Sequence, residues 1–313
     1  MRPFRFSADV SDIVDGPTLA AKARRAETIG YDSLVLGDHL LEQLAPIPAL
    51  AVIAAATERL RIGMFVLNND LRHPAVLAQD LATLDVLSGG RLEIGIGGGW
   101  NEPEYRAIGI PFEEPAVRIA RLAEAVAVLK GLFGEGAFSF RGTYYAIADL
   151  DGRPKPVQRP HPPFLIAGGG RRVRGLAARE AETVGLAPRA LADPGRSFAE
   201  TLAPATAEKI GWIREAAGDR FDGLDLNVYP AVARMSITAH ARQEAAEVSA
   251  RISSRHGQEV SVDDLLESPF TLIGSVEELV AKLRGLRERL GINSFTVFDM
   301  DAFAPVVERL AGT

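Results

Sequence analysis

A glycine-rich turn followed by two arginines is the strongest candidate for chemistry in this sequence. Residues 164–167 form an apolar run that predicts a buried strand, and the chain continues through Gly168–Gly170 to Arg171 and Arg172 before a helical stretch. Glycine lets the backbone approach a ligand closely, and a helix N-terminus presents unpaired N–H groups with a partial positive charge. This pattern favours a phosphate-binding turn, although a run of glycines can also serve only to reverse the chain.

An Asp-His pair is the second candidate. Asp38 and His39 follow the apolar run 33–36, so both are expected where a buried strand ends. Histidine can donate or accept a proton near neutral pH, which makes His39 a candidate acid or base. The alternative is that Asp38 is a helix N-cap residue and that His39 is a surface side chain.

Two further positions could contact a flat ring. Trp100 follows three glycines, where its side chain can lie against a planar ligand or, as the alternative, close the top of the core. Asn68 and Asn69 follow another predicted strand, and their amides can hold the polar edge of a heterocycle or only form a turn.

Composition and missing motifs exclude several classes of function. The 313 residues carry a net charge of −6 and include no cysteine, which argues against nucleic acid as a partner and excludes disulfides and thiolate chemistry. No lysine lies where a predicted strand ends and no Gly-x-Ser-x-Gly is present, which disfavours Schiff-base aldolases and serine hydrolases. No metal is predicted, because the strand-end carboxylates Asp9, Asp38 and Asp299 lack a second histidine beside His39. Without a long apolar run or a signal peptide, a cytoplasmic protein that does not enter the membrane is expected.

The order of the predicted elements indicates a (β/α)8 barrel of the TIM type. Apolar strands alternate with helices along the chain, as expected for a closed parallel barrel whose strands are covered on both faces. The structural rival is a doubly wound sheet, but no GxGxxG opens the first helix. The strands are predicted at 4–8, 33–36, 61–67, 92–96, 164–167, 184–187, 224–228 and 295–298, and the helices at 17–29, 48–57, 74–87, 117–132, from the glycine turn to 181, around 205–217 and at 276–290.

The whole chain, 1–313, is predicted to form a single barrel domain with two insertions. Residues 131–163 hold several prolines and a hairpin-like pattern, and residues 234–269 include a polar helical piece near 240–252. Long excursions of this kind usually form lids or oligomer contacts. Active sites of barrels lie where strands end, so the candidate residues above are expected at one end of the barrel.

These features resemble the luciferase-like oxidoreductases, a (β/α)8 superfamily, and within it the coenzyme F420-dependent enzymes. The stretches that carry the resemblance are AETIGYDSLVLGDHL, RIGMFVLNNDLRHPAVLAQDLATLDVLSGGRLEIGIGGGWNEPEYRAIGIPF, PPFLIAGGGRRV and TLIGSVEELVAKLRGLRERLGINSFTVF, in this order. The resemblance implies an oxidoreductase that transfers a hydride between the deazaflavin F420 and a small organic substrate at the C-terminal mouth of the barrel.

The resemblance also implies roles for individual residues. His39 would lie near the reacting ring as an acid or base, with Asn101 as a second catalytic residue. Phe65-Val66 matches a dipeptide that often forms a non-prolyl cis bulge against the ring, and Gly168–Gly170 match the phosphate turn. The full set of implied cofactor contacts is Asp38, Phe65, Val66, Asn68, Gly97, Gly98, Trp100, Gly168, Gly169, Gly170, Arg171 and Arg172.

Two alternatives stay open, an FMN-dependent monooxygenase on the same barrel and a non-catalytic flavin-binding barrel. The loop after the fourth strand reads Gly-Gly-Gly-Trp-Asn where some F420-dependent sugar-phosphate dehydrogenases carry a glutamate, and lysines are scarce. The resemblance therefore does not extend to sugar-phosphate oxidation. It does imply a homodimer, packed through helices near the second and third strands.

Overall fold

The structure, a computed structural model, describes residues 1–40, 43–189, 198–230, 234–256 and 259–313. The chain forms two compact units. Unit 1 consists of Met1–Asp9, Ile29–Asp32 and Ala167–Thr313, and unit 2 consists of Val10–Thr28 and Ser33–Ile166. The single domain expected over 1–313 stays a prediction.

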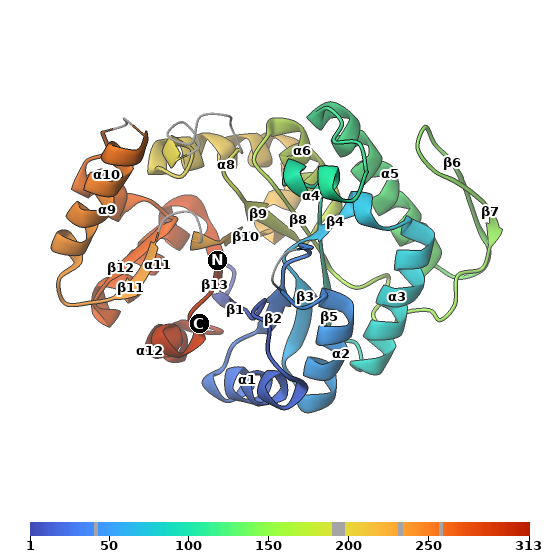
Figure 1. Cartoon of the computed structure of the whole chain (residues 1–313), viewed down its shortest axis with the longest axis horizontal. Helices are drawn as coiled ribbons and strands as arrows, with labels where there is room; N and C mark the ends of the chain where they lie inside the picture. Colours follow the sequence, from blue (N-terminus) through green and yellow to red (C-terminus); the bar gives the residue numbers. More distant parts are fainter. Residues whose placement is uncertain (41–42, 190–197, 231–233, 257–258) are drawn as a thin grey trace. The chain divides into compact units, whose positions relative to one another are not determined.

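The strands of the main sheet form a closed parallel barrel of the (β/α)8 type, as predicted. Figure 1 labels these strands along the chain. They are hydrogen-bonded in the order β3-β2-β1-β13-β10-β9-β8-β5-β4, and β3 also pairs with β5, which closes the sheet. β3 and β4 are the two parts of the third barrel strand. The bounds of the barrel strands are Arg5–Asp9 (β1), Ser33–Leu36 (β2), Arg61–Met64 (β3), Leu67–Asn68 (β4), Leu92–Gly97 (β5), Phe164–Gly168 (β8), Thr183–Leu186 (β9), Asp225–Val228 (β10) and Ile292–Val297 (β13).

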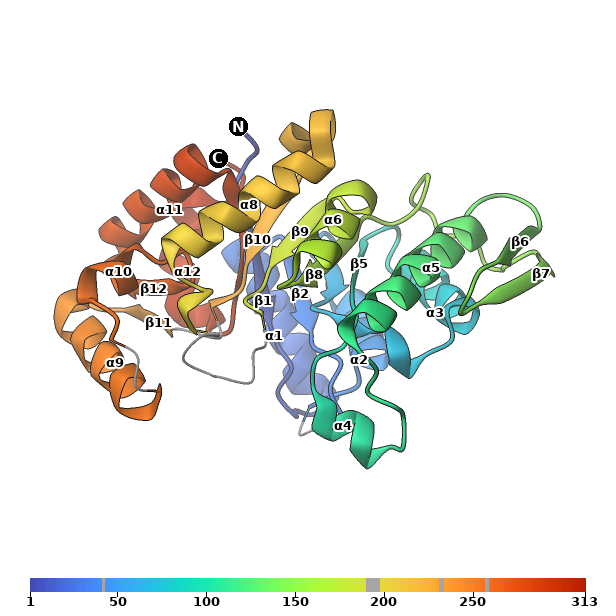
Figure 2. The same cartoon turned by 90° about the horizontal axis from the view of Figure 1, so that it is seen from above.

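Helices follow the strands along the chain and cover them within each unit (Figure 2). In unit 2, α2 lies against β2 and β3, and α3 lies against β5. In unit 1, α6 lies against β9, and α11 lies against β13. The bounds of the helices are Gly16–Ile29 (α1), Pro46–Ala56 (α2), Asn69–Leu71 (η1), Pro74–Leu87 (α3), Glu102–Ala107 (α4), Pro115–Phe133 (α5), Arg171–Glu180 (α6), Ala203–Ala217 (α8), Gly218–Gly223 (η2), Ala241–His256 (α9), Val262–Glu267 (α10), Val276–Leu290 (α11) and Met300–Leu310 (α12).

Local sequence signals explain where these elements begin and end. Every residue of β13 is buried, so its sequence is not alternating, as expected for a strand covered on both faces. α11 begins with a capping box in which Ser275 and Glu278 satisfy each other's backbone N–H groups. It ends at Gly291, which adopts the left-handed conformation with φ 74°.

The third barrel strand is interrupted where the sequence predicted one continuous strand at 61–67. The peptide bond between Phe65 and Val66 is cis, as the resemblance implied. Gly95 on the neighbouring strand β5 makes room for this bulge, because a Cβ atom at Gly95 would lie 1.7 Å from the carbonyl oxygen of Met64. The bulge and Gly95 therefore form one local feature of unit 2.

The insertion at 131–163 contains the predicted hairpin. Its strands β6 (Phe138–Arg141) and β7 (Ala146–Leu150) pair antiparallel and lie beside α5 (Figure 1). Glu124 of α5 holds the connecting turn, because its carboxylate accepts hydrogen bonds of 2.7–3.1 Å from the backbone N–H groups of residues 143–145.

The insertion at 234–269 contains more structure than the polar helical piece that the sequence predicted. β11 (Arg234–Ile237) pairs in parallel with β12 (Thr271–Gly274), and α9 and α10 pack against this pair. The two strands were missed because they are distant in sequence, and no local pattern reports that they pair. Behind them lies a small apolar cluster formed by Phe198, Ala245, Val248, Ile252, Val260, Leu265 and Ile273.

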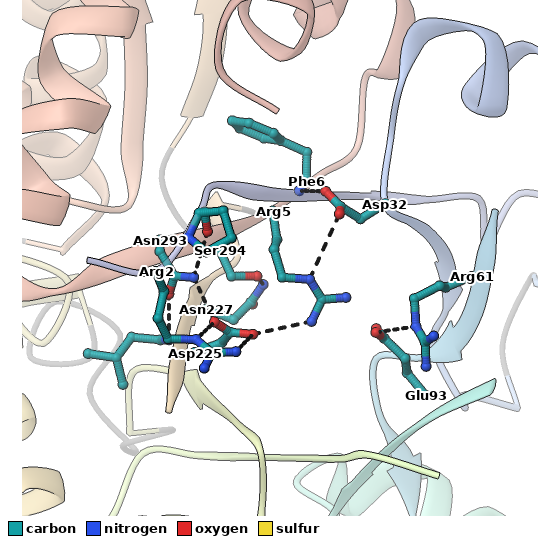
Figure 3. Close-up of polar contacts among 12 residues, drawn as sticks. Arg2, Arg5, Phe6, Asp32, Arg61, Glu93, Asp225, Asn227, Asn293 and Ser294 are labelled. Carbon is teal, nitrogen blue, oxygen red and sulfur yellow. Dashed lines mark hydrogen bonds and ion pairs between the residues drawn. The ribbon is translucent and has the colours of Figure 1, made fainter. Parts of the chain in front are cut away.

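A buried carboxylate anchors the beginning of β10 in unit 1. Asp225 is in contact with the guanidinium groups of Arg2 and Arg5, the latter at 3.3 Å, and accepts a hydrogen bond of 2.7 Å from Asn293 (Figure 3). These contacts join β10 to the segment before β1 and to β13. They lie where strands begin, so they support the barrel rather than the end at which chemistry is expected.

Candidate functional site

Asp38 holds the carboxyl end of β2 through a buried ion pair. Its Oδ2 and Oδ1 atoms lie 2.6 and 2.9 Å from the Nη1 and Nη2 atoms of Arg72. Oδ2 also accepts a hydrogen bond of 2.9 Å from the backbone N–H of Asn68. The N-cap alternative for Asp38 is wrong, because the next described helix, α2, has Ala45 as its N-cap residue. Asp38 positions the ends of β2 and β4, and its contact with a cofactor stays a prediction.

His39 is paired with a carboxylate that the sequence did not indicate. Its Nδ1 atom lies 3.0 and 3.1 Å from the two carboxylate oxygens of Glu104, which belongs to α4. The Glu104 side chain is 5% exposed and that of His39 is 30% exposed. Glu104 is itself fixed, because it accepts a hydrogen bond of 3.2 Å from the backbone N–H of Leu40. An ionised carboxylate only accepts, so the hydrogen of this contact is on Nδ1, and Nε2 is left to exchange a proton with a ligand.

Trp100 lies beside His39 and is largely exposed. The two ring centroids are 5.5 Å apart with an interplanar angle of 78°, and Trp100 is 64% exposed. The alternative of a buried aromatic that closes the core is therefore wrong. An exposed indole next to the imidazole offers a broad apolar surface to a planar ligand.

Asn68, Asp70 and Tyr105 form a polar network at the end of β4. The Oδ1 atom of Asn68 accepts a hydrogen bond of 3.1 Å from the backbone N–H of Asp70 and lies 2.9 Å from the Tyr105 hydroxyl oxygen. Burial, with Asp70 adding to the effect, raises the pKa of Tyr105 to about 12, so this hydroxyl keeps its proton and donates. The turn-forming role of Asn68 is confirmed, because its side chain caps η1. In the part of the chain that the structure describes, its Nδ2 group has no hydrogen-bond acceptor.

The loop after β5 is shaped by its glycines. Gly97 is the last residue of β5. Gly99 has φ 70°, and a Cβ atom there would lie 1.9 Å from the Tyr105 hydroxyl oxygen, so only glycine fits. The buried guanidinium of Arg118 donates to the carbonyls of Gly98, at 3.0 Å, and of Gly99. The Arg118 guanidinium thus fixes the loop that precedes Trp100.

Three other residues predicted to contact a ligand lie in unit 2. Phe65 and Val66, on either side of the cis bond, are half-buried. Asn101 is half-buried and directly precedes α4, but its side chain does not cap that helix. The catalytic role of Asn101 and the ring contacts of Phe65 and Val66 stay predictions.

In unit 1, the glycine turn forms between β8 and α6, as predicted. A Cβ atom at Gly168 would lie 2.5 Å from the side chain of Val173, and one at Gly169 would lie 2.5 Å from the backbone of Arg189. Among the described residues, a Cβ atom at Gly170 would meet nothing within 4 Å and no side chain caps α6. The first two glycines therefore allow close packing, while the open space at Gly170 and the uncapped helix N-terminus suit an anion.

Three arginines follow the glycine turn in different settings. Arg171 and Arg172 are exposed, and Arg171 forms an ion pair of 2.6 Å with Glu215. Arg174 is 1% exposed, and it donates to the carbonyl of Gly169 at 3.3 Å and to a carbonyl after β9 at 2.6 Å. Arg171 and Arg172 were expected beside the turn, whereas the sequence did not indicate that Arg174, two positions further on, is buried.

The strand-end carboxylates that could have bound a metal have other partners. Asp9 accepts a hydrogen bond of 2.8 Å from the Tyr229 hydroxyl, and Asp299 caps α12. Among the described residues, no group of three or more His, Asp or Glu side chains is arranged to hold a metal ion. None of the described helices combines the length and apolar character needed to cross a lipid bilayer.

Several residues of the site were missed because each acts through a distant partner. Glu104 had a local signal, since Pro103 after Glu102 is typical of a first helical turn. That signal predicts a short helix but not the contact with His39. The other missed residues are Arg72, Tyr105 and Arg118.

The fold is a closed (β/α)8 barrel, and a histidine–carboxylate pair lies at the end of its second strand. A family model described as luciferase-like monooxygenase matches residues 2–294, and the chain belongs to this family. The family predicted from the sequence is thereby confirmed.

The relatives of this chain include two kinds of oxidoreductase. It is 32% identical over 278 residues to an F420-dependent glucose-6-phosphate dehydrogenase of Nakamurella multipartita, covering 85% of this chain and 78% of that protein. It is 39% identical over 127 residues to an FMNH2-dependent dimethylsulfone monooxygenase of Pseudomonas putida, covering 41% of this chain and 35% of that protein. This chain spans about half the length of several curated relatives that it matches. The F420-dependent tetrahydromethanopterin reductase of Methanopyrus kandleri has the same fold, with a TM-score of 0.76, 19% identity and coverage of 99% of this chain and 98% of that one.

Proposed function

We propose that this protein is an oxidoreductase that transfers a hydride between coenzyme F420 and a small organic substrate. The observation that carries the proposal is the His39–Glu104 pair, in a chain that belongs to the luciferase-like family. The pair leaves Nε2 of His39 to exchange a proton, and the exposed indole of Trp100 lies next to it. A proton donor or acceptor beside an apolar surface is what a hydride transfer between a flat cofactor and an alcohol or carbonyl substrate requires.

The proposed mechanism assigns separate tasks to the residues of unit 2. Coenzyme F420, when bound, supplies a two-electron carrier of hydride. His39 moves the accompanying proton at Nε2, and Glu104 keeps the imidazole in one tautomer and stabilises its protonated form. Trp100 contacts the imidazole edge to face and offers an apolar surface beside it. Asp38 fixes the backbone that carries His39 through its ion pair with Arg72.

The glycine turn of unit 1 fits the phosphate of such a cofactor. The space beside Gly170 is open and the first N–H groups of α6 are not capped by a side chain. Arg171 and Arg172 are exposed next to them. Backbone amides at a helix N-terminus with adjacent guanidinium groups are the usual elements of a phosphate site.

Coverage of the relatives favours F420 over FMN as the cofactor. The F420-dependent relative from Nakamurella matches 85% of this chain, whereas the FMNH2-dependent relative from Pseudomonas matches 41%. An FMN-dependent monooxygenase is the second candidate, because both kinds of enzyme match this chain. With either cofactor we propose a small-molecule substrate and a homodimer.

A titration with the two cofactors tests the proposal. Trp100 is 64% exposed beside His39, so its fluorescence is expected to fall when a ring stacks near it. The variant Trp212→Phe leaves Trp100 as the reporter, since the chain has 2 tryptophans. We expect saturable quenching by F420 and none by FMN at equal concentration. Quenching by FMN alone would replace the proposal with the monooxygenase, and quenching by neither would refute both.

The substitution Gly170→Ala tests the phosphate site separately from the fold. The added Cβ atom meets nothing within 4 Å and φ at Gly170 is −90°, so the free energy of unfolding should not fall and can rise by about 0.5 kcal/mol. The methyl group would occupy the space offered to the phosphate, so we expect at least tenfold weaker F420 binding, measured by fluorescence. Gly211→Ala, also in open space but on α8, is the matched control and should leave the affinity unchanged. Unaltered F420 affinity in Gly170→Ala would place the phosphate elsewhere.

A further inference from the structure

Arg174 is a buried cation with an unused hydrogen-bonding group. Its side chain is 1% exposed, and its Nη1 atom is buried without a partner in the described chain. The Nε atom donates to the carbonyl of Gly169 at 3.3 Å, and Nη2 donates to the carbonyl of Ala187 at 2.6 Å. The guanidinium therefore lies directly against the glycine turn, between the ends of β8 and β9. Buried polar groups are nearly always paired, so an unpaired one calls for an explanation.

The charges around Arg174 do not balance. Burial lowers the pKa of Arg174 to about 10, so the side chain is still protonated at neutral pH. The nearest carboxylate is Glu200, which is already bound by Arg189 at 2.6 Å and by the buried Lys209 at 2.8 Å. Among the described residues, the buried cations Arg174 and Lys209 thus share Glu200, while the exposed Arg189 is offset by Glu208 as well. A buried charge without a counter-charge is costly, so a protein retains it where a ligand supplies the missing anion.

The missing anion fits the N-terminus of α6. This helix has ten residues, and in the part of the chain that the structure describes no side chain caps it and a Cβ atom at Gly170 would meet nothing within 4 Å. Arg174 is in the first turn of α6 and holds the carbonyl of Gly169, so the turn's carbonyl points to the guanidinium and not to the open side. A dianion beside the first amides of the helix would be attracted by the helix dipole and by the buried charge together.

We propose that Arg174 is the positioning residue that makes the glycine turn select ligands carrying a phosphate group over the same ligands without one. The inference rests on the proposed function, because it takes a phosphorylated flavin or deazaflavin as the ligand class. Arg174 acts without direct contact, by ordering the turn and by supplying positive potential through a water-poor interior. Charge interactions are several-fold stronger in such an interior than at the surface.

Paired ligands test the inference by binding rather than by activity. The affinities of F420 and of its phosphate-free deazaflavin chromophore, and of FMN and riboflavin, are measured by fluorescence for the wild type, Arg174→Gln and Arg174→Lys. For the pair that the wild type binds, we expect the preference for the phosphorylated member to fall at least tenfold in Arg174→Gln. It should be largely kept in Arg174→Lys, which retains the charge. Arg179→Gln, which removes an exposed charge from the last turn of the same helix, is the matched control and should keep the preference.

A merely structural role for Arg174 predicts a different result. In that case Arg174→Gln would weaken both members of a ligand pair equally, and that result would overturn the inference. If Arg174→Gln does not fold, the variant Glu200→Gln tests the inference instead. Removal of the shared carboxylate should strengthen binding of the phosphorylated ligand only. Equal strengthening of both ligands, or none, contradicts the inference. If the wild type binds none of the four ligands, the proposed function fails. The anion site is then tested with inorganic phosphate in thermal unfolding. Stabilisation that is lost in Arg174→Gln and kept in Arg179→Gln still supports the anion site. No stabilisation of the wild type by phosphate overturns the inference.

Discussion

Replacement of His39 by alanine is expected to lower kcat by about 10²–10⁴-fold, the usual contribution of a general acid or base. The Nδ1 side of the imidazole is held by Glu104, so the substitution removes the group that exchanges a proton at Nε2 while leaving most of the surrounding surface in place. Cofactor affinity should therefore change little. Steady-state rates and a fluorescence titration on the same preparation measure the two effects.

Two further variants make the His39 result specific. His73→Ala is the matched control, because His73 is exposed and contacts the backbone N–H of Ala75 and the ring of Tyr145 rather than His39. It should leave kcat unchanged. Glu104→Gln should lower kcat less than His39→Ala, because the amide oxygen can still accept a hydrogen bond from Nδ1 but carries no charge to stabilise the protonated imidazole. An inert His39→Ala variant that still binds the cofactor would favour a non-catalytic flavin-binding barrel.

Replacement of Asp38 by alanine is expected to lower the free energy of unfolding by about 3 kcal/mol. The Asp38 side chain is 3% exposed, and its loss leaves the Arg72 guanidinium and the backbone N–H of Asn68 without their acceptor. Urea denaturation at neutral pH measures the change.

An exposed ion pair of unit 2 is the control for Asp38. Asp12 lies 3.2 Å from Lys22, but its side chain is 80% exposed, so Asp12→Ala should cost less than about 1 kcal/mol. Equal losses in the two variants would mean that the Asp38–Arg72 pair contributes no more than a surface contact.

The barrel was predictable from the sequence because its signals are local. The buried strand β2 contains the apolar run 34–36, and proline and glycine mark the ends of helices such as α3 and α11. The interruption of the third strand is not visible as a break in the apolar pattern at 61–67. Only the resemblance to the family indicated it, since its cause is a peptide-bond conformation at Phe65-Val66.

The candidate site was predictable only in part, because its residues work in pairs that are distant in sequence. His39 and the glycine turn stood out by type and position at strand ends. The partners of His39 and Asp38, which are Glu104 and Arg72, lie 65 and 34 positions further along the chain. No local periodicity reports such a contact. The burial of Arg174 was likewise not predicted, because three arginines close together in sequence are typical of an exposed basic patch.

The network at the end of β4 fixes the orientation of the Asn68 side-chain amide and thereby which of its polar groups a ligand can contact. An amide can normally turn over and offer either its oxygen or its nitrogen. Here the backbone N–H of Asp70 donates to the amide oxygen of Asn68, so rotation of the amide would place two donors against each other. A molecule that approaches Asn68 is therefore met by N–H alone, and it gains a bond there with a carbonyl or an imine nitrogen but not with an amine or amide hydrogen.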